Sequence, residues 1–425
     1  MQEKLLQFIW QYHLYRPDNL YTTDGEKVQV IHPGSLNTNA GPDFHSARIR
    51  IGNILLAGNV ELHIKTSDWS RHGHDGDHAY SNLILHIVHE HDEPVLPAGI
   101  AVLALKDHIP SFVIDKYTNL IQTTAALPCA ARLSGVKSII KESWLSRLLV
   151  ERLEQRLTDW QDELTQANND WRTFLYRRMA SNFGFKVNST AFLMLAQSLP
   201  LQHLGKQHHL LQIEALLFGQ AGMLAGQFAD EYPQLLQQEY RYLQQKYKLK
   251  PIPGHLWKFM RLRPANFPTV RIAQFAALVH QSLHLFTKIG DGKSLEELTR
   301  LLSVTASEYW DTHYRFDDGS SHKDSPKRLG DDSVFNIIVN TIAPVQFLYN
   351  HQQGRMKESD EALQLLDKVP AENNNILRLW NEHHWKAENA AQSQALIQLY
   401  NHYCSRKRCL ECSIGLSIIR SGPDK

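Results

Sequence analysis

The sequence predicts an α+β protein in which a small mixed α/β domain, residues 1–117, precedes a large helical region, residues 118–425. Two observations predict this division. Up to about residue 115, strand-like alternation and Gly, Pro or Asn turns follow one short amphipathic helix. From about residue 135 onward, apolar residues recur mainly at three- and four-residue steps, which is typical of amphipathic helices. We therefore place the boundary between Thr118 and Pro128.

The N-terminal elements follow from local patterns. Apolar residues at helical spacing predict an opening helix within residues 1–15, and Asp24-Gly25 is a turn signal before a strand at 28–31. The segment 32–43 is rich in Gly, Pro and Asn and is expected to be irregular. Gly52-Asn53 joins two strands, about 47–51 and 54–65, as a hairpin. Strands at 83–89 and 100–105 complete this domain.

The helical region begins with a long amphipathic helix that includes Trp144 and Leu164. Further helices are predicted at 170–183, 190–199, 207–226, 230–248, 270–286, 293–315, 333–350, 357–367 and 373–404. The segment Phe316–Asp332 is rich in Asp, Gly, Ser and Lys, so we expect it to be a linker.

Charge and cysteine content exclude several classes of protein. The 425 residues include 45 Lys and Arg against 44 Asp and Glu, so any binding of a polyanion requires local clustering of charge. No apolar run approaches the ~20 residues that span a bilayer, and the N-terminus lacks the pattern of an export signal. Four cysteines in a chain of this length do not form a disulfide framework. We expect a cytoplasmic protein with reduced thiols.

A pair of carboxylates stands out in the predicted hairpin. Asp43 lies where one strand begins, and alternation places Glu61, His63 and Lys65 on one face of the next strand. Asp43 and Glu61 could hold Mg²⁺ or Mn²⁺, while His63 or Lys65 orients or deprotonates a water molecule. Hydrolysis of a phosphodiester bond needs this combination. The alternative is that Glu61 and Lys65 form an ion pair on a solvated face of the sheet.

These residues resemble the motif of the PD-(D/E)XK nuclease superfamily, in which an Asp opens one strand and Glu-x-Lys follows on the next. Gly41-Pro42-Asp43 matches the first element, whereas His63 stands where the motif has Lys, and Lys65 follows two positions later. The resemblance implies an α-β-β-β-α-β core over about 100 residues and a metal-dependent nuclease or phosphodiesterase. Because some members of the superfamily are degenerate, it also allows a non-catalytic nucleic-acid-binding or scaffold protein.

Nearly the whole chain is similar to a bacterial domain-of-unknown-function family. Three runs carry this resemblance: GPDFHSARIRIG, VELHIKTSDWSRHGHDGDHAYSNLILHIV and YCSRKRCLECSIG. The resemblance implies a family but no activity.

A histidine-rich segment follows the Glu61 strand. It contains Asp68, His72, His74, Asp75, Asp77 and His78. His72, His74 and Asp77 have ligand types suited to zinc and would give a hydrolase of another class. The alternative is a polar loop with exposed histidines in which Asp68 caps a short helix.

Three of the four cysteines, Cys404, Cys409 and Cys412, cluster near the C-terminus, and Cys129 lies near the predicted domain boundary. Four thiolates brought together could hold zinc or an iron–sulfur cluster. His402 is an alternative fourth ligand, and ordinary unligated thiols are a further interpretation.

Residues 240–290 contain no Asp or Glu. The cationic residues predicted to bind nucleic acid are Arg241, Lys246, Lys248, Lys250, Lys258, Arg261 and Arg263. They alternate with aromatic residues that could stack on unpaired bases of DNA or RNA. The alternative is a solvated helix face whose aromatic residues, Trp257 and Phe259 among them, pack in the core.

Overall fold

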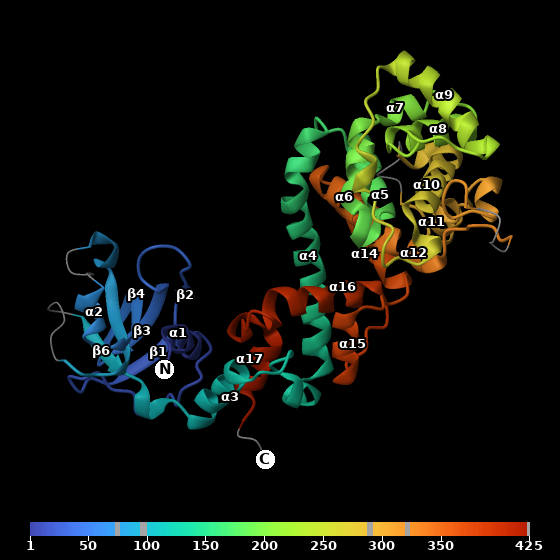
Figure 1. The fold of residues 1–425 in the computed structure, drawn as a ribbon. Coiled ribbons are helices and arrows are strands. Elements are labelled where there is room, and N and C mark those ends of the chain that lie inside the picture. The colour runs from blue at the N-terminus through green and yellow to red at the C-terminus, as the bar shows by residue number, and fades with distance from the viewer. Residues whose placement is uncertain (73–76, 94–99, 287–291, 319–323, 423–425) are drawn as a thin grey trace. The chain divides into compact units, whose positions relative to one another are not determined.

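The computed structural model describes the chain except for residues 73–76, 94–99, 287–291, 319–323 and 423–425 (Figure 1). Its α+β class agrees with the prediction. The chain forms two compact units: unit 1 comprises residues 1–144 and 399–425, and unit 2 comprises residues 145–398. The predicted boundary at 117/118 lies inside helix α3 (Ser111–Gln122), and the last residues of the chain return to unit 1.

Unit 1 is built on one mixed sheet. Its strands are β1 (Val28–His32), β2 (Ser35–Leu36), β3 (Phe44–Ile51), β4 (Ile54–Lys65), β5 (Leu83–Glu90) and β6 (Ala101–Ala104). The order is β1-β3-β4-β5-β6, with β2 paired to β3. The predicted hairpin is present, since β3 and β4 are antiparallel and separated by Gly52-Asn53. By contrast, β4, β5 and β6 run parallel to one another, so β4 lies between an antiparallel and a parallel neighbour.

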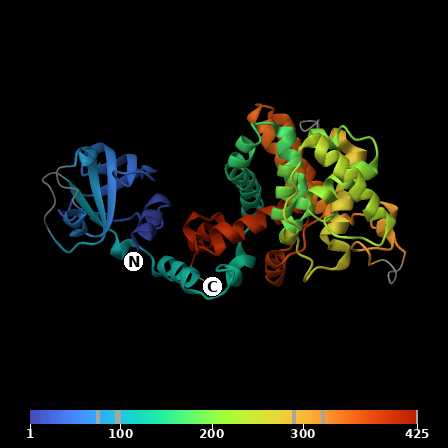
Figure 2. The same ribbon diagram turned by 45° about the horizontal axis from the view of Figure 1, so that its top comes forward.

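Helix α1 (Glu3–Gln11) packs against β4, the strand at the centre of this sheet. Leu5, Leu6, Phe8, Ile9 and Trp10 are buried, which is the apolar face that the spacing predicts. The connection from β4 to β5 includes helix α2 (Asp68–Arg71) and a 3₁₀ turn at His78–Tyr80. Figure 2 shows α1 beside the twisted sheet. The expected α-β-β-β, short helix, β-β succession is therefore observed, with one additional two-residue strand, β2.

The remaining elements of unit 1 come from two distant parts of the chain. From the first part come α3, a 3₁₀ segment at Ala130–Gly135 and the start of α4 (Ser138–Gln166). From the C-terminus come a π-helical turn (Leu399–Cys404), a 3₁₀ turn (Cys409–Glu411) and α17 (Ser413–Arg420). Helix α17 packs against α3.

The regular secondary structure of unit 2, in its described residues, is helical apart from two isolated bridges, Thr305 with Arg328 and Pro370 with Asn389. Its helices after α4 are α5 (Trp171–Phe183), α6 (Phe185–Ser198), α7 (Leu201–Leu204), α8 (Leu210–Gln220), α9 (Glu231–Tyr247), α10 (Pro268–Ser282), α11 (Leu295–Leu302), α12 (Asp331–Ile337), α13 (Ala343–Gln352), α14 (Met356–Lys368), α15 (Asn375–Glu382) and α16 (Ala390–Gln398). Helix α10 is buried over nearly its whole length and contacts α5, α8 and α11, so it forms the centre of this core (Figure 1).

Two long helices predicted in this region are shorter. The helix expected at 293–315 ends at Leu302, because the Leu329 N–H donates to the Val304 carbonyl and the Ala306 N–H to that of Lys327. The helix expected at 373–404 is divided into α15 and α16 by residues 383–389. In the helix expected at 293–315, the hydrogen bonds to the distant segment that contains Lys327 and Leu329 therefore outweigh the helical spacing of the apolar residues.

The segment expected to be a linker, 316–332, is in part packed. Residues 319–323 lie outside the described residues, but Leu329 is fully buried and the Lys327 ammonium donates to the carbonyls of Asp311 and Ser325. The composition indicates a loop correctly, whereas the packing of its second half depends on residues far away in sequence. None of the described helices is long and apolar enough to cross a membrane.

Candidate functional site

Asp43, immediately before β3, lies beside Glu61 on β4, and each carboxylate accepts a hydrogen bond from the backbone of the other segment. The Asp43 N–H donates to Glu61 Oε2 at 2.9 Å, and the Leu62 N–H donates to Asp43 Oδ2 at 3.0 Å. The preceding loop fixes this position, since the Asn37 amide donates to the Pro42 carbonyl and the Asn37 N–H to that of Asp43. Gly41 adopts φ of 100°, a conformation that favours glycine. The structure therefore brings the predicted pair together.

Burial disfavours the charged form of both carboxylates. It raises the pKa of Asp43 to about 6, against the lowering effect of hydrogen bonds from Gln7 and Leu62. Burial, followed by the charge of Asp43, raises the pKa of Glu61 to about 8. Glu3 on α1 adds negative charge near both groups. A bound divalent cation would offset this repulsion.

Helix α1 contributes polar groups that the sequence analysis did not identify. The Gln7 side-chain amide donates to Asp43 Oδ1 at 2.8 Å. Glu3 lies one turn earlier, and burial raises its pKa. The sequence did contain a signal for this contribution: Glu3 and Gln7 are polar residues four positions apart on a helix whose other face is apolar.

Three histidines form a hydrogen-bonded row beside Glu61. His63 Nδ1 lies 2.9 Å from His86 Nε2, and His63 Nε2 lies 3.0 Å from His72 Nδ1. The same His63 Nε2 is 3.7 Å from Glu61 Oε1. His63 and His86 are buried, whereas His72 is exposed, and the Trp69 ring packs against both buried imidazoles. The row therefore runs from the interior of the sheet to its surface.

Lys65 is not part of this row. Its side chain is 53% exposed and its ammonium lies 3.9 Å from Asp92 Oδ2, in an ion pair near the end of β4. His63 thus occupies the position two residues after Glu61, next to its carboxylate. The alternative Glu61–Lys65 ion pair is absent from the interactions that the described residues show for Lys65.

The histidine-rich segment is only partly described, because His74 and Asp75 lie outside the described residues. Asp77 accepts a hydrogen bond from the Ala79 N–H and so begins a 3₁₀ turn. Asp68 lies inside α2 as its first residue, where it accepts from the Lys65 N–H and pairs with Arg71. Within the described ranges, no three His, Cys, Asp or Glu side chains form a ready-made metal site.

All four cysteines are in unit 1, and all are free and buried. Burial raises the pKa of each thiol, and that of Cys129 rises to about 12 with added effects of Cys412 and Cys409. Burial also raises the pKa of Cys404, with contributions from Cys129, Cys412 and Cys409. The thiols are therefore close enough to influence one another.

The predicted nucleic-acid-binding residues lie on α9 and on the connection between α9 and α10. All seven predicted nucleic-acid-binding side chains are exposed: Arg241, Lys246, Lys248, Lys250, Lys258, Arg261 and Arg263. Of the aromatic residues, Trp257 is buried and donates to the Ala221 carbonyl, whereas Tyr242 is 61% exposed. Phe259 is half-buried under the Arg315 guanidinium. The cations are thus available to a polyanion, while only some of the aromatic residues are available to stack.

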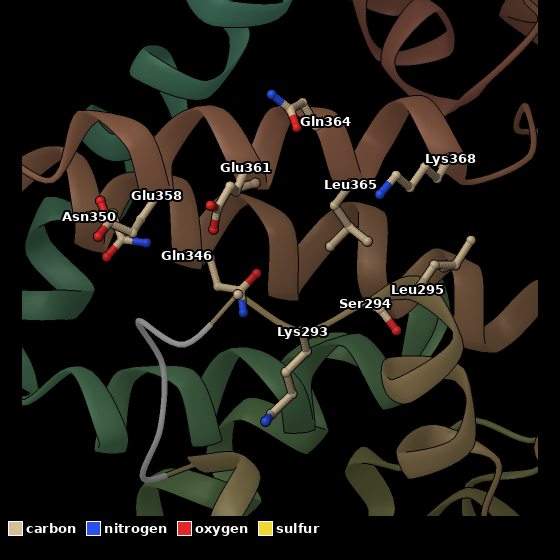
Figure 3. Close-up of a pocket in the computed structure, with 12 residues that line it drawn as sticks. Lys293, Ser294, Leu295, Gln346, Asn350, Glu358, Glu361, Gln364, Leu365 and Lys368 are labelled. Atoms are coloured by element: carbon tan, nitrogen blue, oxygen red, sulfur yellow. The ribbon is translucent and has the colours of Figure 1, made fainter.

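A separate cavity of about 180 Å³ lies in unit 2 between the start of α11 and helices α13 and α14 (Figure 3). Lysines and glutamates both line it, including Lys293, Glu361 and Lys368. Asn350 Oδ1 is buried there and lacks a partner among the described residues. The cavity has room for several water molecules, which would satisfy this oxygen.

Comparison with known proteins places the chain in one family. A family model described as "Protein of unknown function (DUF2851)" matches residues 3–375. No curated protein and no solved structure matches the chain.

Proposed function

Because the chain belongs to the DUF2851 family, whose description carries no activity, we propose a function from its own geometry: divalent-metal-dependent hydrolysis of phosphodiester bonds in DNA or RNA. The observation that carries the proposal is the reciprocal fixing of Asp43 and Glu61. Their carboxylates are oriented by backbone hydrogen bonds and lie in a site where burial disfavours their charge. Such a pair gains stability when a cation binds, and the row of histidines supplies groups that accept protons.

Asp43 and Glu61 together supply the protein ligands that Mg²⁺ or Mn²⁺ commonly needs, since these ions retain water molecules and bind phosphate oxygens as well. When bound, the ion offsets the negative charge that develops on the phosphate.

His63 is the residue best placed to act as general base. In the proposed reaction, water attacks phosphorus, a new P–O bond forms, and the bond to the leaving sugar oxygen breaks. His63 accepts the proton of the attacking water through His72, the exposed member of the row, while the contact with His86 orients the His63 ring. The leaving oxygen takes a proton from solvent, so the proton balance is closed. Lys65 faces Asp92 and has no part in this step.

The exposed cations of the α9–α10 region support a nucleic acid as substrate. Seven cationic side chains lie in a stretch without Asp or Glu, in a chain whose net charge is only +1. A concentration of positive charge attracts a phosphate backbone regardless of base sequence. This surface would bind the polymer and the carboxylate site would cleave it.

A second candidate function is a non-catalytic nucleic-acid-binding or scaffold protein with a degenerate nuclease-like core. The replacement of the motif lysine by a buried histidine favours it, because a nuclease lysine also stabilises the transition state by its charge. The zinc hydrolase based on His72, His74 and Asp77 has less support, since Asp77 is engaged with the Ala79 N–H.

The test is cleavage of single- and double-stranded DNA and RNA with Mg²⁺ or Mn²⁺ by wild type, Glu61→Gln and Glu90→Gln. Glu61→Gln keeps an oxygen for the Asp43 N–H but removes the charge. Glu90, which pairs with Lys106 in the 3₁₀ turn that follows β6, is the matched control. Cleavage that is lost only in Glu61→Gln supports the proposal. Metal-dependent cleavage by all three proteins would contradict it, and cleavage by none would favour the binding protein.

A further inference from the structure

The four cysteines are the strongest cluster that the proposed hydrolysis does not use. They are the only cysteines in the chain, and Cys129 is far in sequence from Cys404, Cys409 and Cys412. All four nevertheless lie in unit 1, with exposures of 7–8%. A buried cysteine by itself is a small apolar side chain, so the question is whether their surroundings suit thiols or thiolates.

Short helices bring the cysteines together. Cys129 immediately precedes the 3₁₀ segment Ala130–Gly135, and Cys412 immediately precedes α17. These two elements pack against each other. Cys404 ends the π-helical turn and Cys409 begins the next 3₁₀ turn, and these two turns are also in contact. Each cysteine therefore stands at an end of a short helix, where the chain changes direction.

The region around Cys412 provides donors to sulfur. The N–H groups of Ile414 and Gly415 belong to the first turn of α17, where backbone N–H groups have no carbonyl partner within the helix. Position 412 is also the N-cap of α17, an eight-residue helix whose dipole favours negative charge there.

Gly415 holds two of the cysteines close together. A Cβ atom at this position would overlap the Cys409 carbonyl oxygen, so only glycine allows the turn between Cys409 and Cys412 to close. Lys407, between Cys404 and Cys409, has φ of 52° and donates from its ammonium to the carbonyls of Ile121 and Thr123 at 2.6 and 2.9 Å. The C-terminal turn is thus already fastened to the segment that leads to Cys129.

A second lysine anchors the end of this region. The Lys116 ammonium is buried and donates to the carbonyls of Ser421 and Gly422 at 3.0 and 2.7 Å. The segments that carry the four thiols are therefore held in place without any ligand.

We propose that Cys129, Cys404, Cys409 and Cys412 bind one thiolate-ligated metal centre, zinc or an iron–sulfur cluster, which fastens the C-terminal turn to the segment before α4. The thiols do not form a closed site in the described residues, so they turn toward one another when the centre binds and lose their protons to it. The chemistry of this metal centre is independent of the Asp43–Glu61 pair.

The experiment is metal analysis of the full chain purified without oxygen. We expect either about one zinc per chain, or iron with matching acid-labile sulfide and absorbance near 400 nm. Each Cys→Ser variant should lose most of this metal. His402→Ala is the matched control, because His402 lies in the same turn and is the alternative fourth ligand. It should retain the metal content of wild type.

Thiol alkylation of the wild type keeps the test independent of whether the variants fold. All four cysteines should resist a maleimide until a chelator removes the metal, and mass spectrometry identifies the labelled positions. Absence of zinc and iron, with alkylation unaffected by the chelator, would overturn the proposal. Metal retained in Cys129→Ser but lost in His402→Ala would overturn the assignment of Cys129.

Discussion

Gln7 and Asp43 are joined by a hydrogen bond of 2.8 Å that connects the first helix to the start of β3. The amide donates to Oδ1, while the Leu62 N–H donates to Oδ2, so both oxygens of Asp43 are oriented. The hydrogen bond from Gln7 lowers the pKa of Asp43 against the effect of burial. A helix that the motif does not include therefore sets the charge and direction of a proposed metal ligand.

Replacing Gln7 with leucine should weaken metal binding. The lost donor raises the pKa of Asp43 further above about 6, so the proton competes better with the cation near neutral pH. We expect about a tenfold loss of Mn²⁺ affinity by calorimetry at pH 6.5, the size of one hydrogen bond to a charged group. Gln11→Leu, at the end of the same helix, is the control. Equal affinities for both variants would show that Gln7 does not act on Asp43.

His63→Gln should separate metal binding from hydrolysis. Glutamine retains hydrogen-bonding capacity toward His72 and His86 but cannot accept the proton of water. We expect kcat for DNA or RNA cleavage to fall by about 10²–10⁴ with Mn²⁺ affinity unchanged. The exposed His45→Gln serves as the control. Unchanged kcat in His63→Gln would remove this residue from the mechanism.

Glu214 should make unit 2 less stable as the pH rises. It is buried, accepts from Ser307 Oγ at 2.6 Å, and has a pKa raised by burial to about 7. Between pH 4.5 and about 7 the unfolded chain has lost this proton, whereas the folded chain still holds it. The free energy of unfolding therefore falls as the pH rises through this range, by at most about 3 kcal/mol. Glu214→Gln should remove that part of the pH dependence. Urea unfolding at pH 4.5 and 8.5 tests this, with the exposed Glu388→Gln as control.

Neutralising Lys248 and Lys250 should weaken nucleic-acid binding and its dependence on salt. Both are exposed in the acid-free stretch, and each phosphate contact releases bound counterions. For the double glutamine variant we expect the slope of log K against log salt to fall by about 1.4–1.8. Lys357 and Lys386, also exposed, provide the control pair. An identical slope in both double variants would place the nucleic acid elsewhere.

Local signals predicted much of the N-terminal fold. The Gly52-Asn53 turn correctly fixed the hairpin, and strand alternation placed Glu61 and His63 on one face. The closeness of Asp43 and Glu61 followed from the hairpin alone. These predictions succeed because the residues involved are near in sequence, so turn type and the two-residue period determine their relation.

Contacts between distant segments were not predictable in this way. His86 meets His63 only because β4 and β5 pair in parallel, and nothing in either strand specifies that register. Gln7 reaches Asp43 because α1 packs on β4. The shortening of the helix after Leu302 depends on the segment that contains Leu329. Each of these features is a product of tertiary packing, which a single sequence does not encode locally.

The discontinuity of unit 1 sets an order for its assembly during translation. Residues 145–398 are made between its two parts. At ~5–20 residues per second, a ribosome needs about 13–50 s to synthesise them. The surface of α3 that later receives α17 stays uncovered throughout this interval, within reach of chaperones or of another nascent chain. A protein that binds this surface of α3 first would keep α17 from packing there, and unit 1 would then stay incomplete.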